Sequence, residues 1–579
     1  MVGAEPLEAV VIGSGFGGAV ACCRLAQRWP GQVLLLERGQ RYPKGSFARD
    51  PHGFATQFWA ASKGPRTLNG LFDIRNFRRM DAVVAAGLGG GSLVYANVFM
   101  RPPTWVFEQG WPQGWSLERL APYYRVAQSV LGARPLPPDG GDPRRVVKRQ
   151  QLFQAFAQHE GRPTHAPDIA VFFGRGYADQ QGQPTPMGQQ ERNRYGATQT
   201  SCTYCGECNI GCNLHAKNSL DLNYLYAAEH IHHAQVETGV EATCITPLGV
   251  GGQPDSTATG VHGYQVDYTD TQGAVHRVRA RRVVVAAGTL GTNELLLRCR
   301  DEHGTLPRLS AQLGRRFSGN GDFVSVVVQG QKDAAPNHGP VITQCIDFGL
   351  AEKPEEGKPA FQLEDAAYPP LVSWYVEGLR PILTPWQLLS KVGGVVQLLW
   401  TGVRQRVWGG KWSGSVVHYA AALLKEDMSY RSSVLLFMGK DRGDGVFHLN
   451  GGRLELHWPQ ATSRPLYDAM DACGARFKRF VQAKKYLPQP TWAWPVRNNI
   501  TVHPLGGCAL ADSPEQGVAS AHDHERGQLF GYQHLYVTDG ALIPGSIGAN
   551  PSATITALAE WVCEGITGLT PDDQLGATT

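Results

Sequence analysis

The sequence predicts an α/β fold: a Rossmann-type dinucleotide-binding domain joined to a second, α+β domain built on a mostly antiparallel sheet. Two observations indicate the first domain. A glycine-rich turn follows the first apolar run and opens a helix, and a second apolar run then ends in an acidic residue. A third observation indicates the second domain, because the middle of the chain leaves this pattern before glycine-rich motifs return near the C-terminus. At 579 residues the chain is too long for one hydrophobic core.

The first motif is GSGFGG, which places glycines at positions 13, 15 and 18 between a strand-like run, residues 8–12, and a helix-like run. Gly13 permits the tight turn, Gly15 lets a pyrophosphate approach the backbone, and Gly18 lets helix and strand pack closely. Glu37 ends the second apolar run and can accept hydrogen bonds from ribose hydroxyls. The spacing therefore predicts a dinucleotide site at the start of the helix, where the helix dipole is positive.

Two later segments indicate that the dinucleotide is FAD. Residues 81–103, DAVVAAGLGGGSLVYANVFMRPP, contain a run of glycines where backbone can lie against a flat ring. Residues 281–298, RRVVVAAGTLGTNELLLR, combine a buried strand, a glycine turn and a helix. This second segment is expected to return the chain to the first sheet.

Composition argues against several classes of protein. The net charge is +4 with no block of like charge, so nucleic-acid binding is not expected. The N-terminus enters a strand without a basic and apolar leader, and no window of about 20 residues is free of charges and helix breakers. We therefore expect a cytoplasmic protein. In that compartment clustered cysteines favour metal or redox chemistry over structural disulfides.

Two C-terminal segments complete the set of motifs. HPLGGC occupies residues 503–508, and LYVTDGALIPGSIGANPSATITALAE occupies residues 535–560. Together with GSGFGG, GLGGGSLV and AAGTLGTNELLLRCRDEHGTLP, they occur in the order typical of glucose-methanol-choline (GMC) oxidoreductases. The sequence resembles this family, and within it is most similar to the cholesterol oxidases.

The resemblance implies an FAD-binding domain at residues 1–320, a substrate-binding domain at 321–494, and a return to the FAD-binding domain at 495–579. It also implies which residues contact FAD, although Tyr95 stands where cholesterol oxidases have asparagine. The FAD contacts implied are Gly13, Gly15, Gly18, Glu37, Gly89, Gly90, Gly91, Ser92, Ala242, Asp539, Gly540, Asn550, Pro551 and Thr554.

Oxidising an alcohol requires that a base take the hydroxyl proton and that a hydride move to flavin N5. A neutral imidazole suits the first event, and a second polar side chain must orient the hydroxyl. The resemblance implies that His503 and Asn550 form this pair, and leaves open which of them takes the proton. A core histidine bonded to backbone is the alternative for His503. The resemblance also implies that Glu364 moves a proton during double-bond isomerisation, with Asp365 as the competing assignment and an exposed acid pair as the alternative.

The segment TSCTYCGECNIGC, residues 200–212, holds four cysteines in the pattern C-x2-C-x2-C-x3-C. This is the spacing of bacterial iron–sulfur ferredoxins, although asparagine rather than proline follows the last cysteine. Flavoprotein subunits of some glucose and fructose dehydrogenases carry a similar loop, which implies a cluster near the flavin. Zinc, a disulfide pair or free thiols are the alternatives. The predicted ligands are Cys202, Cys205, Cys208 and Cys212.

The middle of the chain is expected to form the substrate domain. Residues 323–330 and 416–424 read as strands, and residues 467–483 read as a helix. Residues 380–412 mix apolar side chains, tryptophans and basic residues. They could form buried helices, a lid, a subunit contact or a patch peripheral to a membrane. Trp492 and Trp494 could line the pocket or pack in the core.

These features predict an FAD-dependent oxidoreductase acting on a bulky apolar secondary alcohol, with a 3-hydroxysterol as the expected substrate. Electrons would pass to oxygen or to a redox carrier, and a cluster would favour a dehydrogenase over an oxidase. The alternatives are a sugar or aliphatic-alcohol dehydrogenase of the same family, and a non-catalytic flavoprotein that serves as a redox partner.

Overall fold

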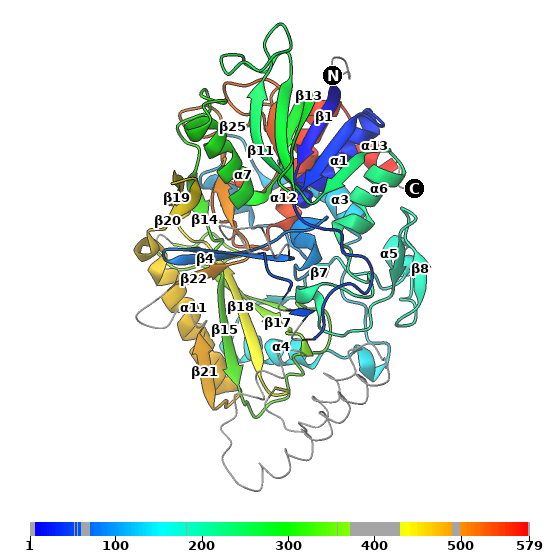
Figure 1. Ribbon diagram of the computed structural model, residues 1–579. Helices are drawn as coiled ribbons and strands as arrows, with labels where there is room; N and C mark the ends of the chain where they lie inside the picture. Colours follow the sequence, from blue (N-terminus) through cyan, green and yellow to red (C-terminus); the bar gives the residue numbers. More distant parts are fainter. Residues whose placement is uncertain are drawn as a thin grey trace, which may run out of the picture.

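The computed structural model describes residues 6–50, 53–54, 56–59, 70–180, 182–355, 357–370, 429–488 and 498–576. Two sheets dominate it, one formed by both ends of the chain and one by its middle (Figure 1). The predicted strand at 416–424, the tryptophan-rich segment 380–412, Trp492 and Trp494 lie outside the described residues. Within the part that is described, no helix has the length and apolar character needed to cross a bilayer.

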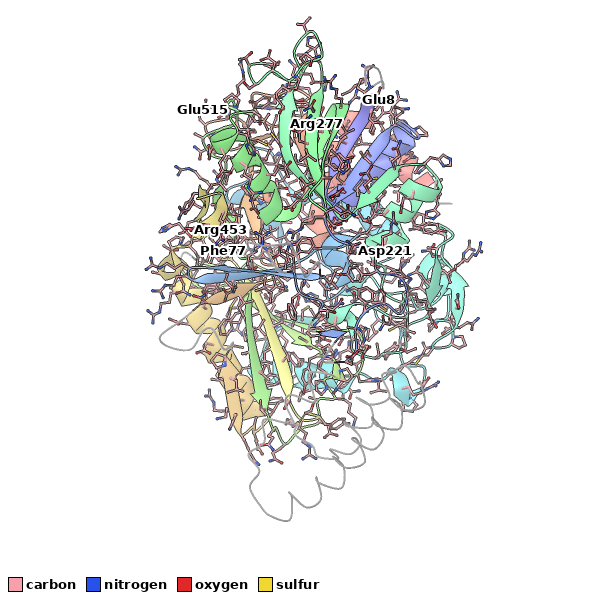
Figure 2. The ribbon with its side chains drawn as sticks, viewed as in Figure 1. Glu8, Phe77, Asp221, Arg277, Arg453 and Glu515 are labelled. Atoms are coloured by element: carbon pink, nitrogen blue, oxygen red, sulfur yellow. The ribbon has the colours of Figure 1, made fainter. Side chains whose placement is uncertain are left out.

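The larger sheet has seven strands in the order β10-β2-β1-β13-β12-β11, with β26 also paired to β13. Its parallel part joins β10, β2, β1, β13 and β26, and an antiparallel hairpin of β11 and β12 extends one edge. The strands are β1 (Leu7–Ile12), β2 (Val33–Glu37), β10 (Gln235–Thr238), β11 (Val240–Pro247), β12 (Tyr264–Asp270), β13 (Val275–Val285) and β26 (Leu535–Val537). Figure 2 shows Glu8 and Arg277 at the end of this sheet that points away from the second one.

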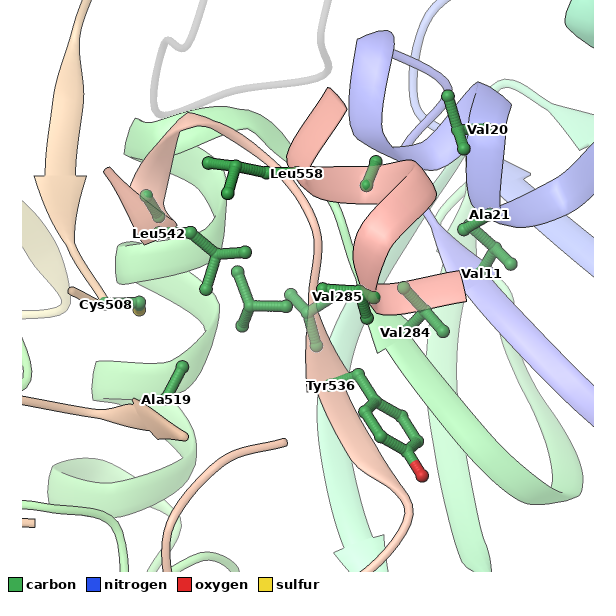
Figure 3. Close-up of a cluster of buried hydrophobic side chains, with 14 of the residues drawn as sticks. Val11, Val20, Ala21, Val284, Val285, Cys508, Ala519, Tyr536, Leu542 and Leu558 are labelled. Carbon is green, nitrogen blue, oxygen red and sulfur yellow. The ribbon is translucent and has the colours of Figure 1, made fainter. Parts of the chain in front are cut away.

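The core of this domain lies where helices α1 (Phe16–Arg28) and α12 (Ser552–Thr567) cover the central strands. Figure 3 shows Val11 and Val284 of the strands beside Val20 and Leu558 of these helices. Between the two helices a buried ion pair joins the chain ends: Arg24 donates to both carboxylate oxygens of Glu560 at 2.9 and 2.7 Å. The N- and C-terminal motifs therefore belong to one domain.

The second sheet is antiparallel throughout its described pairs, with the order β21-β15-β18-β17-β16-β6. This confirms the predicted fold class. The strands are β6 (Thr164–His165), β15 (Phe323–Val328), β16 (Cys345–Phe348), β17 (Phe361–Ala366), β18 (Ser433–Gly439) and β21 (Lys485–Pro488). Two helices, α4 (Lys148–Glu160) and α11 (Gln460–Phe480), bury aromatic side chains against it, with Phe153 and Phe156 packed on Phe477.

The N-terminal half of the chain also contributes to this second domain. Helix α4 and strand β6 precede residue 320, yet they pack on or pair with strands that follow it. The predicted division at residue 320 was placed where the nucleotide pattern stops, and neither element carries a pattern that marks its partner. Tertiary packing alone assigns α4 and β6 to the sheet formed by the middle of the chain.

A small third sheet connects the two larger domains. In it β22 (Asn499–Thr501) runs parallel to β4 (Met80–Ala85), which also pairs with β3 (Phe72–Phe77). Residue 503 follows β22 directly, and the second glycine turn follows β4. Because the two strands are parallel, both following segments emerge at the same edge.

Candidate active site

A single cavity of about 540 Å³ runs from the carboxyl ends of β1 and β2 to the inner face of the antiparallel sheet. This volume lies within the range of cofactor and substrate sites. The wall near β2 is polar and includes Glu37, Arg38, Asp73 and Arg75, whereas the opposite wall is apolar. This change from a polar to an apolar wall suits one elongated ligand with a charged end, placed beside an apolar molecule.

The first glycine turn has the geometry that its spacing predicts. Gly13 has a φ of +97°, and a Cβ there would meet the Ala286 carbonyl oxygen at 2.3 Å. A Cβ on Gly18 would lie 1.9 Å from the Gly13 carbonyl oxygen. At Gly15, by contrast, a Cβ would meet no atom within 4 Å. Gly13 and Gly18 thus permit close backbone packing, while Gly15 faces open space at the N-terminus of α1, as a pyrophosphate would require.

The Glu37 carboxylate lies in the cavity wall and holds the turn together. One of its oxygens accepts hydrogen bonds from Ser14 N at 3.0 Å and from Ser14 Oγ at 2.6 Å, and the other accepts from Gly39 N at 2.8 Å. Each carboxylate oxygen has two lone pairs, so the oxygen bonded to Gly39 retains capacity for a ribose hydroxyl. The predicted contact therefore fits, although sequence reasoning missed the structural role of this residue toward Ser14.

The second glycine turn packs directly on the first. A Cβ on Gly90 would lie 2.7 Å from Gly15 Cα, and Gly91 faces open space. Ser92 Oγ donates to Gly89 O at 2.7 Å and accepts from Leu220 N at 3.0 Å, so this hydroxyl shapes the turn from behind. The turn thus brings a flat backbone surface to the middle of the cavity.

The predicted cofactor residues divide into two groups. Those that line the cavity are Gly13, Gly15, Glu37, Gly90, Gly91, Ala242, Asp539, Gly540, Asn550 and Pro551. The other four, Gly18, Gly89, Ser92 and Thr554, lie outside its wall. Thr554 is fully buried and its hydroxyl shares a hydrogen bond with Tyr124 at 2.8 Å, so it supports α12. Tyr95 lines the cavity, and its ring packs edge-on against Phe16.

His503 is held by a buried carboxylate that sequence reasoning missed. Its Nδ1 lies 2.9 Å from Asp322 Oδ1, and Asp322 Oδ2 accepts from the backbone N–H groups of Val502 and His503 at 2.8 and 3.1 Å. Because a carboxylate only accepts hydrogen bonds, Nδ1 carries a hydrogen, and in the neutral form of the ring the lone pair is on Nε2. His503 is thus not a core histidine bonded only to backbone, since its ring lies in the cavity wall.

Asp322 has no motif of its own in the sequence. It follows the turn 319–321 and immediately precedes β15, and only the fold brings it close to His503, which is 181 residues further along the chain. The available signal is weak: an acidic residue at the edge of an otherwise apolar strand.

Asn550 lies just before α12 and lines the same cavity as His503. Its Nδ2 donates to Glu364 Oε2 at 3.4 Å, while its Oδ1 is buried without a hydrogen-bond partner in the described part of the chain. A buried acceptor without a partner is costly, which indicates a position that a ligand donor would satisfy.

The structure separates the two acids that the sequence leaves ambiguous. Neighbouring residues of a strand face opposite sides, so Glu364 faces Asn550 whereas Asp365 faces helix α4. Asp365 pairs with Arg149 at 2.9 Å and accepts hydrogen bonds from Thr343. Both acids are fully buried, so the alternative of an exposed acid pair is wrong.

Glu364 is fully buried, and its Oε1 accepts a hydrogen bond from Gln362 Nε2 at 3.2 Å. Burial raises the pKa of its carboxyl to about 8, and the hydrogen bond from Asn550 opposes this effect. Cys345, its cross-strand neighbour, lies with its sulfur 3.7 Å from Glu364 Oε1. A carboxyl with this pKa is mostly protonated at neutral pH and can both donate and accept a proton.

The cysteine-rich segment packs beside the cavity, which Asn209 helps to line. Cys202 Sγ accepts from Tyr204 N at 3.4 Å, and Cys212 Sγ accepts from Ala216 N at 3.3 Å. The buried ammonium of Lys217 donates to Cys208 O at 2.9 Å and lies 4.8 Å from the Tyr95 ring centroid.

The predicted convergence of four cysteines on a metal is not seen in this arrangement. Among the described residues, no three or more His, Cys, Asp or Glu side chains form a group suited to a metal ion. Cys205 is exposed, whereas Cys202 and Cys208 pack in different apolar clusters. The spacing of the cysteines in the sequence therefore does not by itself bring their sulfurs to one point.

Known proteins resemble this chain over most of its length. The family model described as GMC oxidoreductase matches residues 8–303, and a C-terminal model with the same description matches residues 465–559. A cholesterol oxidase from Acinetobacter baumannii is 28% identical, over 95% of this chain and 92% of that protein. A long-chain-alcohol oxidase from Arabidopsis thaliana is 20% identical, over 95% of this chain and 65% of that protein.

A solved structure shares the fold. Pyridoxine 4-oxidase from Mesorbium loti superposes with a TM-score of 0.56 at 15% identity, covering 96% of this chain and 98% of that one. At this identity the likeness concerns the architecture of the two domains.

The buried Glu364 carboxyl predicts a pH-dependent stability. Between its ordinary pKa of 4.5 and the folded-state value of about 8, the folded protein holds a proton that the unfolded chain releases. The contribution of the Glu364 carboxyl to the free energy of unfolding therefore falls as pH rises through this window, by up to about 1.4 kcal/mol per pH unit. Glu364→Gln should gain stability relative to wild type from pH 5 to pH 8, measured by urea unfolding.

The matched control lies on the opposite face of the same strand. Asp365→Asn should destabilise the protein across the range, because Arg149 then lacks its charged partner. A difference between Glu364→Gln and wild type that does not change with pH would contradict the raised pKa.

Proposed function

The chain belongs to the GMC oxidoreductase family and is an FAD-dependent alcohol oxidoreductase, and we propose that it oxidises a bulky, apolar secondary alcohol, a 3-hydroxysterol. The observation that carries this proposal is the apolar wall above His503 and Asn550. It consists of small and branched side chains of the antiparallel sheet and its neighbouring loops, including Val324, Val434 and Leu436. A sugar would leave its hydroxyl groups without partners against such a wall.

The similarity to cholesterol oxidases supports the same substrate class, but the long-chain-alcohol oxidase also matches. A straight-chain alcohol is thus the second candidate. The width of a fused ring system suits a broad sheet face better than a single chain does. The non-catalytic alternative has less support, because a histidine oriented by a carboxylate beside an unpaired amide oxygen is an arrangement for handling a hydroxyl proton.

In the proposed reaction His503 Nε2 takes the single hydroxyl proton, and Asp322 holds the imidazole in the required tautomer. The Asn550 amide is too weak a base to remove this proton, and it would orient the hydroxyl oxygen through the hydrogen of Nδ2 that is not given to Glu364. Bound FAD supplies the acceptor for the hydride that leaves the alcohol carbon. The glycine turns and the N-terminus of α1 would hold its pyrophosphate, and Glu37 its ribose.

Glu364 is proposed to serve a second step on a sterol, the shift of a double bond. This step needs one group that removes a proton from a ring carbon and returns it to another. A buried carboxyl with a pKa of about 8, joined to Asn550, has both capacities near neutral pH.

The iron–sulfur cluster remains a separate proposal. Its support is the C-x2-C-x2-C-x3-C spacing, the position of the loop against the cavity, and backbone N–H donors to Cys202 and Cys212. If oxygen is the acceptor instead, the loop has only a structural role. A cytoplasmic location and membrane contact through residues 380–412 likewise remain proposals.

A substrate screen tests the proposed function. We expect kcat/KM for a 3-hydroxysterol to exceed that for glucose and for straight-chain alcohols by on the order of 10²-fold. His503→Ala should lower turnover by about 10²–10⁴-fold while the flavin absorption remains, and the exposed His276→Ala should change neither. Preference for a sugar would contradict the sterol assignment. A flavin-bound protein that oxidises no alcohol would support the non-catalytic alternative.

Two variants distinguish a role of Asp322 in orienting His503 from a role in folding of the turn. Asp322→Asn should lower kcat by about 10²-fold or more, with KM and flavin content nearly unchanged, because the imidazole loses its orienting acceptor. Asp441 is the matched control, since this buried carboxylate holds the same turn through Ser318 and Gly321 without touching His503. An equal loss of kcat in Asp441→Asn would show that Asp322 acts only on the turn.

The cluster proposal predicts iron and acid-labile sulfide in protein purified without oxygen, together with a broad visible shoulder on the flavin spectrum. Cys205→Ser should remove the iron, whereas Cys473→Ser, in the buried face of α11, should retain it. Wild-type protein that contains flavin but neither iron nor sulfide would exclude the cluster.

A further inference from the structure

Two cysteines lie beside each other behind the polar end of the cavity, apart from the cysteine-rich loop. Cys244 belongs to β11, and Cys299 belongs to the π-helical turn Arg298–Glu302 that continues α7 (Gly288–Leu297). Thr305 lies between them: its hydroxyl oxygen is 3.5 Å from the Cys244 sulfur and donates to the Cys299 carbonyl oxygen at 3.3 Å. The Cys299 sulfur in turn accepts from Ile245 N at 3.3 Å. The Cys299 sulfur therefore touches the residue that follows Cys244, and both cysteines share Thr305 as a neighbour.

The surroundings of Cys244 stabilise a thiolate. The neighbouring Cys299 thiol has the largest effect, and the Thr305 and Thr246 hydroxyls lie 3.5 and 3.8 Å from the Cys244 sulfur. With a further contribution from His303, these groups lower the pKa of Cys244 to about 6, against the effect of partial burial. Tyr532 is the titratable group that faces Cys299 from the C-terminal segment.

The other described cysteines lack this combination. Burial raises the pKa of each cysteine in the following set: Cys22, Cys345, Cys508 and Cys563. Cys244 is partly exposed, whereas these four cysteines are buried. A partly exposed thiolate beside a second, protonated thiol is the arrangement found in cysteines that respond to oxidants.

We propose that Cys244 is a peroxide-reactive cysteine and that Cys299 is its resolving partner. The Cys244 thiolate attacks hydrogen peroxide; an S–O bond forms, the O–O bond breaks and hydroxide leaves. The Cys299 thiol then attacks the sulfenic sulfur and loses its proton, an S–S bond forms and water leaves. Each sulfur gives up one electron, and the peroxide takes both.

The position of this pair links it to the cofactor end of the cavity. Ala242 and Arg298 both line the wall, the first two residues before Cys244 and the second directly before Cys299. A β-bulge interrupts the pairing of β11 with β12 between Ala242 and Cys244, and such bulges re-aim the side chains next to them. A disulfide would join two walls of the cavity immediately behind their lining residues.

The test uses the full-length, flavin-bound protein and mass spectrometry of each cysteine. Brief treatment with hydrogen peroxide should yield a Cys244–Cys299 linked peptide. Iodoacetamide should label Cys244 with a half-maximal rate near pH 6, so that at pH 7 its thiolate fraction exceeds that of an ordinary thiol by about 30-fold.

Two variants of Cys299 separate its functions. Cys299→Ser keeps a hydrogen-bond donor but cannot form a disulfide, so Cys244 should stop at a sulfenic acid that dimedone traps. Cys299→Ala removes the donor, so the pH profile of Cys244 labelling should move upward. Cys473→Ala, in α11, should leave both results unchanged. Wild-type protein that forms neither the linked peptide nor a dimedone adduct at Cys244, or whose Cys244 labels like an ordinary thiol, would overturn the proposal.

Discussion

The structure depends on one constraint, the contact of bare backbone at the first glycine turn. Side chains at Gly13, Gly17 and Gly18 would place a Cβ 2.3, 2.1 and 1.9 Å from the carbonyl oxygens of Ala286, Thr538 and Gly13. Real Cβ atoms do not approach oxygen so closely, so any substitution must separate α1 from the sheet. Three segments far apart in the chain meet at this point. Their meeting creates the polar end of the cavity and brings the segment that carries Asp539 and Asn550 to its wall.

The reacting groups lie at the junction between the two domains, so neither domain contains a complete site. His503 follows the small connecting sheet, whereas Asp322, which orients it, precedes the first long strand of the antiparallel sheet. Likewise Asn550 precedes a helix of the first domain and donates to Glu364 of the second. A shift of one domain against the other would separate both pairs together. The proposed chemistry therefore requires that the two domains keep their relative position, and the sheet of β3, β4 and β22 lies beside His503 at their junction.

Sequence reasoning succeeds where a motif and its structural task are local. The strand, glycine turn, helix and acid at the N-terminus need only neighbouring residues, and each glycine has the predicted environment. In the middle of the chain, the apolar run 323–330 correctly predicts β15 (Phe323–Val328), whereas the run 416–424 lies outside the described residues. Asp322, α4 and β6 could not be predicted, because their partners are distant in sequence and neither their composition nor their periodicity identifies those partners. The choice between Glu364 and Asp365 likewise needed the strand's orientation, which decides which side chain faces Arg149.

The cysteines show most clearly that their spacing in the sequence does not determine their chemical character. Residues 202–212 present a regular pattern, yet burial raises the pKa of Cys202, Cys205 and Cys208. Repulsion from the other cysteines of the loop also raises these pKa values. Such thiols become ligands only when a cation compensates the charge of several thiolates at once. Cys244 has no pattern around it, but polar groups that follow it in β11 and in the segment 299–305 surround its sulfur. Thiolate character is thus a property of the folded neighbourhood, and a regular spacing indicates only where ligands could gather.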